Sequence, residues 1–292
     1  MMNGVAAHDI RFGDSVIRYY TAGDHGPPVV LLHGGGSDAA MLTWKKIIGP
    51  LAESYRVYAP NLPGHGDSPP YRGRFTQEAL VHCVGEILDA WGLERAALVG
   101  LSMGGSVAIG YTLTHPDRVT HLIPIDSGGL QARAPFHRIA FFVMRMPLLN
   151  ELMWGWMRNN RNLVRMGMRN IIYTPSAITD ELVDDVYAVL QTARPEHSFH
   201  QWQIDETRWR GLRTNYMPRL HTITCPVLII HGDKDAIVPL ACAQEAAARI
   251  PNAQLHIIKD CGHWPTRERS EVVAQAICSF LTRMEQAHAP GV

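Results

Sequence analysis

Short apolar runs of strand length alternate with longer amphipathic stretches along the first part of the chain. Strands are predicted at residues 5–12, 16–21, 28–32, 55–59, 96–99 and 119–125, and helices at 41–53, 76–91 and from the turn after 99 through 114. Apolar runs separated by helical patterns are typical of parallel βαβ units. The pattern therefore predicts an α/β fold whose sheet has helices on both faces.

The alternation stops near Gly128 and Gly129 and resumes with an apolar run at 225–231, a last strand at 255–258 and a closing helix at 271–284. Between these parts, residues 131–216 show no strand alternation and are rich in Met, Trp and Arg. A helical block that interrupts an α/β alternation indicates an insertion. We therefore predict a core from residues 1–130 and 217–292, with a helical cap at 131–216.

Composition excludes several classes of protein. The 292 residues are 46% hydrophobic and 18% charged, and Lys plus Arg and Asp plus Glu both number 27. With no net charge, neither nucleic acid nor an anionic membrane is an expected partner. No apolar segment reaches the ~18 residues of a spanning helix, and the first residues do not follow the pattern of a signal peptide. Five scattered cysteines favour reduced thiols and a cytoplasmic location, while the oligomeric state stays open.

The strongest chemical signal is the segment Gly100-Leu-Ser102-Met-Gly104, between a predicted strand and a predicted helix. It matches the G-x-S-x-G nucleophile elbow, in which a sharp turn exposes the serine hydroxyl at the start of a helix. The flanking glycines leave room for the turn. Ser102 is therefore the predicted nucleophile.

A glycine-rich loop, His33-Gly-Gly-Gly36, follows the strand at 28–32. Acyl transfer needs backbone N–H groups directed at the developing oxyanion, and an HGGG loop is one known way to supply them. The predicted oxyanion donors are the amides of Gly35 and Met103. Gly34 and Gly36 are predicted to line the substrate site beside them.

A base and an acid are expected downstream, because the fold of the nucleophile elbow places them in the order Ser, Asp or Glu, His. His263, in a Gly-His-Trp-Pro segment after the last strand, is the predicted base, and Trp264 beside it is a predicted pocket wall. Asp235, in the loop after the preceding strand, is the predicted acid. Asp126, at the end of an earlier strand, and Asp233 are the alternatives that remain open.

Neither a metal nor a nucleotide is expected. No trio of His, Asp or Glu shows metal-ligand spacing on one element, and no G-x-G-x-x-G or phosphate-loop pattern follows a strand. The sequence therefore predicts catalysis without a cofactor.

Together, the segments at 33–36 (HGGG), 60–68 (PNLPGHGDS), 100–105 (GLSMGG), 232–239 (GDKDAIVP) and 261–265 (CGHWP) resemble the α/β-hydrolase superfamily. The resemblance implies an eight-stranded, mostly parallel sheet, a helical cap after the sixth strand, and no cofactor. Within the superfamily, these segments are similar to carbon–carbon bond hydrolases that cleave ring-fission dienones, and equally to carboxylesterases and cofactor-free haloperoxidase-type enzymes. A serine at position 102 argues against epoxide hydrolases and haloalkane dehalogenases, which use a carboxylate.

The dienone hydrolases usually carry Asn before the nucleophile and an SPGF-type loop, where this chain has Leu101 and the segment 62–65. We therefore predict first the hydrolysis of a small-molecule carboxylic ester through an acyl-enzyme. The Met- and Trp-rich cap favours an apolar acyl or alcohol group. The second hypothesis is carbon–carbon bond or lactone hydrolysis, and the third is a hydrolase-like receptor.

Overall fold

Eight strands form one sheet at the centre of the computed structural model, which describes residues 4–12, 15–70, 73–192 and 195–288. Their order across the sheet is β1 (Val5–Phe12), β2 (Ser15–Ala22), β4 (Arg56–Pro60), β3 (Pro28–Leu32), β5 (Ala96–Leu101), β6 (Val119–Ile125), β9 (Leu228–Gly232) and β10 (Gln254–Ile258). β2 pairs antiparallel with β1 and β4, and the other neighbours are parallel. The predicted eight-stranded, mostly parallel sheet is confirmed.

Helices cover both faces of this sheet. On one face lie α1 (Ala40–Trp44), α2 (Ile48–Ala52) and α12 (Ser270–His288), and on the other α3 (Gln77–Ala90), α4 (Met103–Thr114) and α10 (Leu240–Arg249). Alternate residues of β3 belong to the two cores: Val29 and Leu31 to the first, Val30 and Leu32 to the second. A strand buried on both faces is apolar at every position, which explains the unbroken apolar runs of the sequence.

The single helix predicted at 41–53 is wrong, because α1 and α2 are separate. Pro50 has no amide hydrogen, and within a longer helix its ring would collide with the carbonyl four residues earlier. The chain instead makes a turn before α2, in which the Ile47 amide donates to the Trp44 carbonyl at 2.8 Å. The sequence prediction also omitted α10 and a two-stranded hairpin of β7 (Thr207–Arg208) and β8 (Gly211–Leu212).

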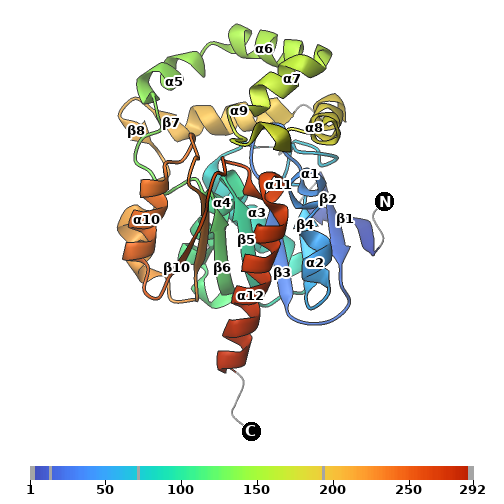
Figure 1. Cartoon of the computed structure of the whole chain (residues 1–292), viewed down its shortest axis with the longest axis vertical. Coiled ribbons are helices and arrows are strands. Elements are labelled where there is room, and N and C mark those ends of the chain that lie inside the picture. The colour runs from blue at the N-terminus through green and yellow to red at the C-terminus, as the bar shows by residue number, and fades with distance from the viewer. Residues whose placement is uncertain (1–3, 13–14, 71–72, 193–194, 289–292) are drawn as a thin grey trace.

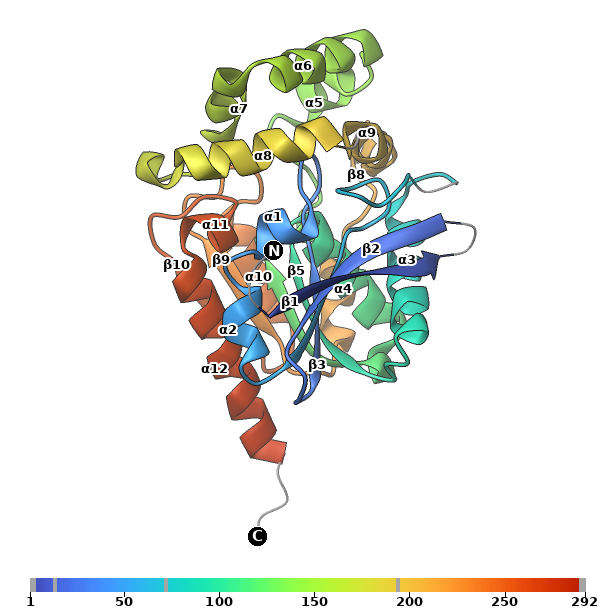
Figure 2. The same ribbon diagram turned by 90° about the vertical axis from the view of Figure 1, so that its right-hand side faces the viewer.

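Between β6 and β9, the described residues form five α-helices that lie above the carboxyl edge of the sheet. We call them the cap helices: α5 (His137–Val143), α6 (Pro147–Asn159), α7 (Arg161–Met168), α8 (Asp180–Thr192) and α9 (Pro195–Glu206). Figures 1 and 2 show α8 and α9 next to the sheet and its loops, with α5, α6 and α7 stacked further out.

The exact division of the chain into core and cap stays a prediction. Residues 1–3, 13–14, 71–72 and 289–292 of the predicted core, and 193–194 of the predicted cap, lie outside the described residues. In the part of the chain that the structure describes, no helix combines the length and the apolar character needed to cross a membrane.

Candidate active site

Ser102 occupies the sharp turn between β5 and α4. Its backbone has φ 51°, which is strained for a residue with a side chain and common at functional sites. The Ser102 amide donates to the Ile125 carbonyl at 2.9 Å, and its carbonyl accepts from the Gly128 amide at 3.0 Å. A side chain at Gly104 would lie 2.3 Å from the Leu32 carbonyl oxygen. The close approach of α4 to β3 therefore requires glycine at that position.

Ser102, His263 and Asp235 form one chain of hydrogen bonds. The Ser102 hydroxyl lies 2.8 Å from Nε2 of His263, and Nδ1 of His263 lies 2.7 Å from Oδ2 of Asp235. Because a carboxylate only accepts, Nδ1 carries the hydrogen and Nε2 is free to accept from the serine. The other carboxylate oxygen of Asp235 accepts from the Ile237 and Val238 amides at 2.7 and 3.0 Å. This is the arrangement in which a histidine removes a serine proton.

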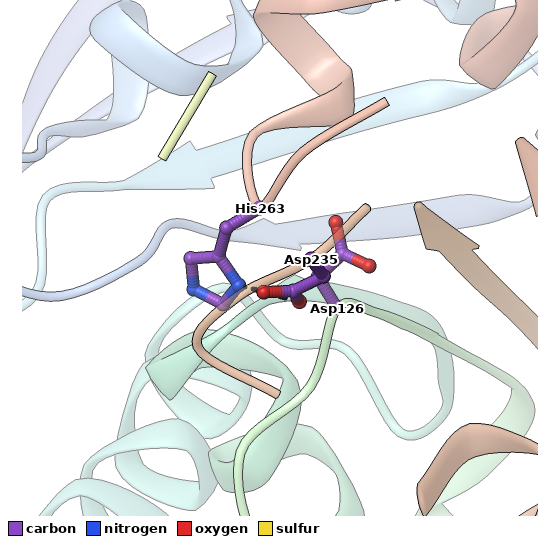
Figure 3. Close-up of side chains that lie close together, drawn as sticks. All are labelled: Asp126, Asp235 and His263. Atoms are coloured by element: carbon purple, nitrogen blue, oxygen red, sulfur yellow. Dashed lines mark hydrogen bonds and ion pairs between the residues drawn. The ribbon is translucent and has the colours of Figure 1, made fainter. Parts of the chain in front are cut away.

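Asp126, the first alternative acid, lies beside this chain without joining it. Figure 3 shows the His263 ring near the carboxylates of Asp126 and Asp235. One oxygen of Asp126 accepts from the Gly232 amide at 2.8 Å and lies 3.2 Å from Nδ1 of His231. Complete burial, together with the nearby charge of Asp235, raises the pKa of Asp126 well above its ordinary value. These surroundings favour a neutral, protonated Asp126.

Asp126, Asp235 and His263 each offer a ligand atom within 4.8 Å of the others. A cation at this position would compete for Nδ1 of His263, which already holds the hydrogen bonded to Asp235. The geometry therefore suits proton transfer better than metal binding.

Asp233, the second alternative acid, forms contacts that connect two loops. Its carboxylate lies 3.3 Å from the Lys234 ammonium and accepts from the Cys261 amide at 3.4 Å. It thus joins the loop after β9 to the loop that precedes His263.

His33 braces the glycine-rich loop next to Ser102. Its Nδ1 donates to the Gly34 carbonyl at 2.7 Å, and its Nε2 accepts from the Leu62 amide at 2.9 Å. These bonds need one protonated and one free ring nitrogen, and burial keeps the ring neutral by lowering the pKa of His33 well below its ordinary value. A side chain at Gly34 would come within 3.7 Å of Ser102 Cβ, so the loop passes directly beside the nucleophile.

Asp38 is a site residue that the sequence analysis missed. Its carboxylate accepts from the amides of Gly34 and Ala39, both at 2.8 Å, and from the Thr43 hydroxyl. The Thr43 oxygen in turn accepts from the indole N–H of Trp264 at 3.4 Å. Burial raises the pKa of Asp38 to about 6. The network joins the glycine loop to the loop of the base, and an acid two residues after the last glycine of the run was the available signal.

This network includes two of the predicted substrate-binding residues, Gly34 and Trp264, whose role in binding stays a prediction. The amide of Gly34 is engaged by Asp38 instead of being directed at a substrate. Trp264 is 6% exposed, with its N–H directed at Thr43, so little of its indole is open as a pocket wall.

Helix α9 brings Phe199 onto the glycine loop. A side chain at Gly35 would lie 2.1 Å from the Phe199 ring, and one at Gly36 would lie 3.7 Å from it. The ring of Phe199 stacks on Trp202 at 5.6 Å, and the Trp202 indole N–H donates to the Gln77 side chain at 3.0 Å. The cap helices therefore contact the loop that contains the predicted oxyanion donor Gly35. Sequence spacing gave no signal for this contact.

A serine, histidine and aspartate arranged in this way at the carboxyl edge of the sheet define a serine hydrolase. The family model described as the alpha/beta hydrolase fold matches residues 27–268, and the chain belongs to this family.

Several of the similar proteins are named for ring-fission substrates. A 2-hydroxy-6-oxo-6-phenylhexa-2,4-dienoate hydrolase from Burkholderia cepacia is 31% identical over 88% of this chain and 88% of its own length. A 2-hydroxymuconate semialdehyde hydrolase from Pseudomonas sp. (strain CF600) is 29% identical over 90% and 89%. Among solved structures, the meta-cleavage product hydrolase of Pseudomonas fluorescens IP01 superimposes with a TM-score of 0.79 at 27% identity, over 95% of this chain and 98% of that one.

These relatives contradict the prediction of carboxylic-ester hydrolysis, because they are named as carbon–carbon bond hydrolases of ring-fission products. That prediction rested on Leu101 and on the segment 62–65. Leu101 is only 3% exposed and belongs to the core between the sheet and helices α1, α2 and α12. His65 is fully buried. Both differences therefore lie among packed protein atoms and give little information about the bond that is cleaved.

Proposed function

We propose that this protein is a carbon–carbon bond hydrolase that acts on a ring-fission dienone. The observation that carries the proposal is the match, over about nine-tenths of both chains, to relatives named for 2-hydroxymuconate semialdehyde and 2-hydroxy-6-oxodienoates. The hydrogen-bonded chain from Ser102 through His263 to Asp235 supports it, since hydrolysis beside a ketone needs an activated nucleophile. A small-molecule dienone then replaces the predicted ester as the partner.

The first step is addition to the ketone. The Ser102 oxygen attacks the carbonyl carbon while its proton passes to Nε2 of His263. The Asp235 carboxylate, which holds the Nδ1 hydrogen, stabilises the imidazolium that forms. The amides of Gly35 and Met103 are the proposed donors to the oxyanion, and one such donor is worth about 10²–10³ in rate.

The second step breaks the carbon–carbon bond. The electron pair of that bond leaves with the dienoate fragment, and His263 returns its proton to this fragment. A carbon leaving group is less stable than an alkoxide, so the substrate must first tautomerise: the 2-hydroxyl loses its proton, carbon 5 gains one, and the double bond moves to carbons 3 and 4. When the bond between carbons 5 and 6 then breaks, its electron pair is delocalised through that double bond onto the ketone oxygen at position 2. The remaining acyl group is an ester of Ser102. Water, deprotonated by His263, then cleaves this ester and releases a carboxylic acid and free Ser102.

The test is a comparison of substrates on the purified protein. With 2-hydroxy-6-oxo-6-phenylhexa-2,4-dienoate, loss of the dienone absorbance should accompany release of benzoate, measured by chromatography. We expect kcat/KM for the dienone to exceed that for p-nitrophenyl esters by at least about tenfold. Higher kcat/KM for the esters would contradict the proposal. Turnover below about one per minute on every compound would favour a receptor, since typical enzymes run near 10 s⁻¹.

A matched pair of serine variants identifies the nucleophile. Ser102→Ala should lower dienone turnover at least about a thousandfold, because the activated hydroxyl is lost. Ser54→Ala removes an exposed hydroxyl far along the chain and should leave turnover unchanged. A Ser102→Ala enzyme within tenfold of wild type would rule out covalent attack by Ser102.

A further inference from the structure

Exposed apolar side chains concentrate on the two outermost cap helices. Of the eighteen large apolar side chains that are exposed among the described residues, ten lie within residues 136–156. They lie in α5, in α6, in the turn between them and at the residue that precedes α5. Both views place α6 at the outer end of the molecule, with no other element above it (Figures 1 and 2). Apolar patches of this kind on a protein surface commonly mark an interaction site.

Helix α6 is apolar on two faces, and only one is covered. Trp154 and Met157 are partly buried and pack against the core cluster that includes α7 and α8. Leu148, Leu152 and Trp156 follow one another at a spacing of four residues on the outer side and are 69%, 48% and 66% exposed. An α-helix that is apolar all round is normally covered all round. No element formed by the described residues therefore covers the outer face of α6.

The same part of the chain is strongly cationic. Residues 131–169 contain seven arginines and a single acidic residue, Glu151, although the whole chain has no net charge. Arg161 and Arg165 form ion pairs with Asp180 and Asp184 of α8. Because those pairs balance the charges of Arg161 and Arg165, the excess positive charge lies toward α5 and the β7–β8 hairpin.

A pocket of about 470 Å³ lies between α5 and the β7–β8 hairpin, beside the apolar face. Arg133, Arg138 and Arg210 line it together with Phe136, Ile139 and Trp209, and no acidic residue contributes to it. The Arg138 guanidinium lies 5.5 Å from the centre of the Trp209 ring. Guanidinium groups bind phosphate oxygens well, and aromatic rings prefer the boundary between water and hydrocarbon.

We propose that the outer face of α5 and α6, together with this arginine pocket, docks on the surface of a bilayer that contains anionic phospholipid. The exposed leucines and aromatic rings enter the boundary between head groups and acyl chains, and the arginines contact the phosphates. A second copy of the chain is a poorer occupant. A symmetric contact pairs the same face of both copies, so it would bring the arginines of one copy toward the arginines of the other. This inference does not depend on the proposed function.

Vesicle sedimentation tests the docking surface. The full-length protein is mixed with vesicles of phosphatidylcholine and phosphatidylglycerol in equal parts, and with vesicles of phosphatidylcholine alone. We expect binding to the anionic vesicles, at least tenfold weaker binding to the neutral ones, and release of the protein by 0.5 M NaCl. Equal partition into both, or no binding to either, would overturn the proposal.

Two variants assign the binding to the proposed residues. Arg133→Gln with Arg138→Gln should weaken binding to anionic vesicles roughly 25-fold, because one cation near such a surface contributes about fivefold. Leu148→Ser with Leu152→Ser should weaken it at least about tenfold, since both side chains lose their burial in lipid. Unchanged binding in either variant would overturn the assignment.

Control variants remove similar groups elsewhere. Arg11→Gln with Arg249→Gln removes two arginines from the surface of the core, and these changes should alter vesicle binding less than twofold. Dienone turnover should be unchanged in the arginine and the leucine double variants. Light scattering tests whether a second copy of the chain covers this face instead. If wild type is a dimer that does not bind vesicles, and the Leu148→Ser, Leu152→Ser variant is a monomer, the face is a dimer interface and the proposal is wrong.

Discussion

Helices α4 and α6 have nearly the same length and both carry apolar side chains around most of their circumference, yet their burial is opposite. Ten of the twelve residues of α4 are buried between the sheet and its neighbouring helices. In α6 only Asn150, one of thirteen residues, is buried. The two helices show that apolar content alone does not say whether this chain covers a helix with its own residues.

The difference follows from what each helix contacts. α4 begins at Ser102 and packs directly on β3, β5 and β6, so its position is fixed by the sheet and in turn fixes the nucleophile. Among the described residues, α6 makes its main contacts with the cap helices α7 and α8 and presents its outer face to the surroundings. Rigid sheet elements thus hold the chemistry, whereas the outer cap helices leave an apolar surface available for binding.

The largest effect should come from a substitution in the active site, which the buried core elements hold in place. Asp235→Asn should lower kcat about 10⁴-fold, because an amide at this position favours the wrong tautomer of His263. Asp126→Asn should cost less than tenfold. The raised pKa of Asp126 favours its protonated form, which an amide resembles in shape and charge. Steady-state kinetics on the dienone measures both. A larger loss for Asp126→Asn would make Asp126 the acid of the site.

Much of the core and the site could be predicted from sequence because both depend on local patterns. Strands such as β3 are apolar at consecutive positions, and the glycines around Ser102 belong to a short turn with a fixed geometry. The order of Ser102, Asp235 and His263 along the chain follows from the fold. The break between α1 and α2 had a local signal in Pro50, although the sequence analysis predicted one helix through it.

The remaining features depend on contacts between distant segments. Phe199 reaches Gly35 only after α9 folds over the sheet, and the role of Asp38 depends on which amides the glycine loop directs toward it. Trp156 illustrates the limit best. The Met- and Trp-rich composition of the cap favoured an apolar group on the substrate, but Trp156 in this segment is 66% exposed on the outer face of α6. Whole-chain charge likewise concealed the cationic segment at 131–169.

The second prediction compares how much two leucines contribute to the free energy of unfolding. Leu98 of β5 is completely buried, and Leu98→Ala should lower the free energy of unfolding by about 2–5 kcal/mol through the cavity it leaves. Leu148 of α6 is 69% exposed, and Leu148→Ala should change it by no more than about 0.5 kcal/mol. Urea denaturation at low protein concentration measures both values. A loss above about 2 kcal/mol for Leu148→Ala would mean that the outer face of α6 is covered in solution.

The smallest effect belongs to the boundary between the two regions, where Phe199 of α9 meets Gly35. A methyl group at position 35 would lie 2.1 Å from the Phe199 ring, so Gly35→Ala must displace either the glycine loop or α9. Displacement of the loop moves a proposed oxyanion donor, and we expect kcat to fall about tenfold to thirtyfold. Phe199→Ala removes the obstacle. The double variant should therefore recover most of the lost kcat, which corresponds to a coupling energy of about 1–2 kcal/mol between the two positions. Single-turnover kinetics of wild type, both single variants and the double variant measures this coupling on the chemical step. Additive losses would mean that Gly35 is required by the loop itself and that the cap helices do not determine its position.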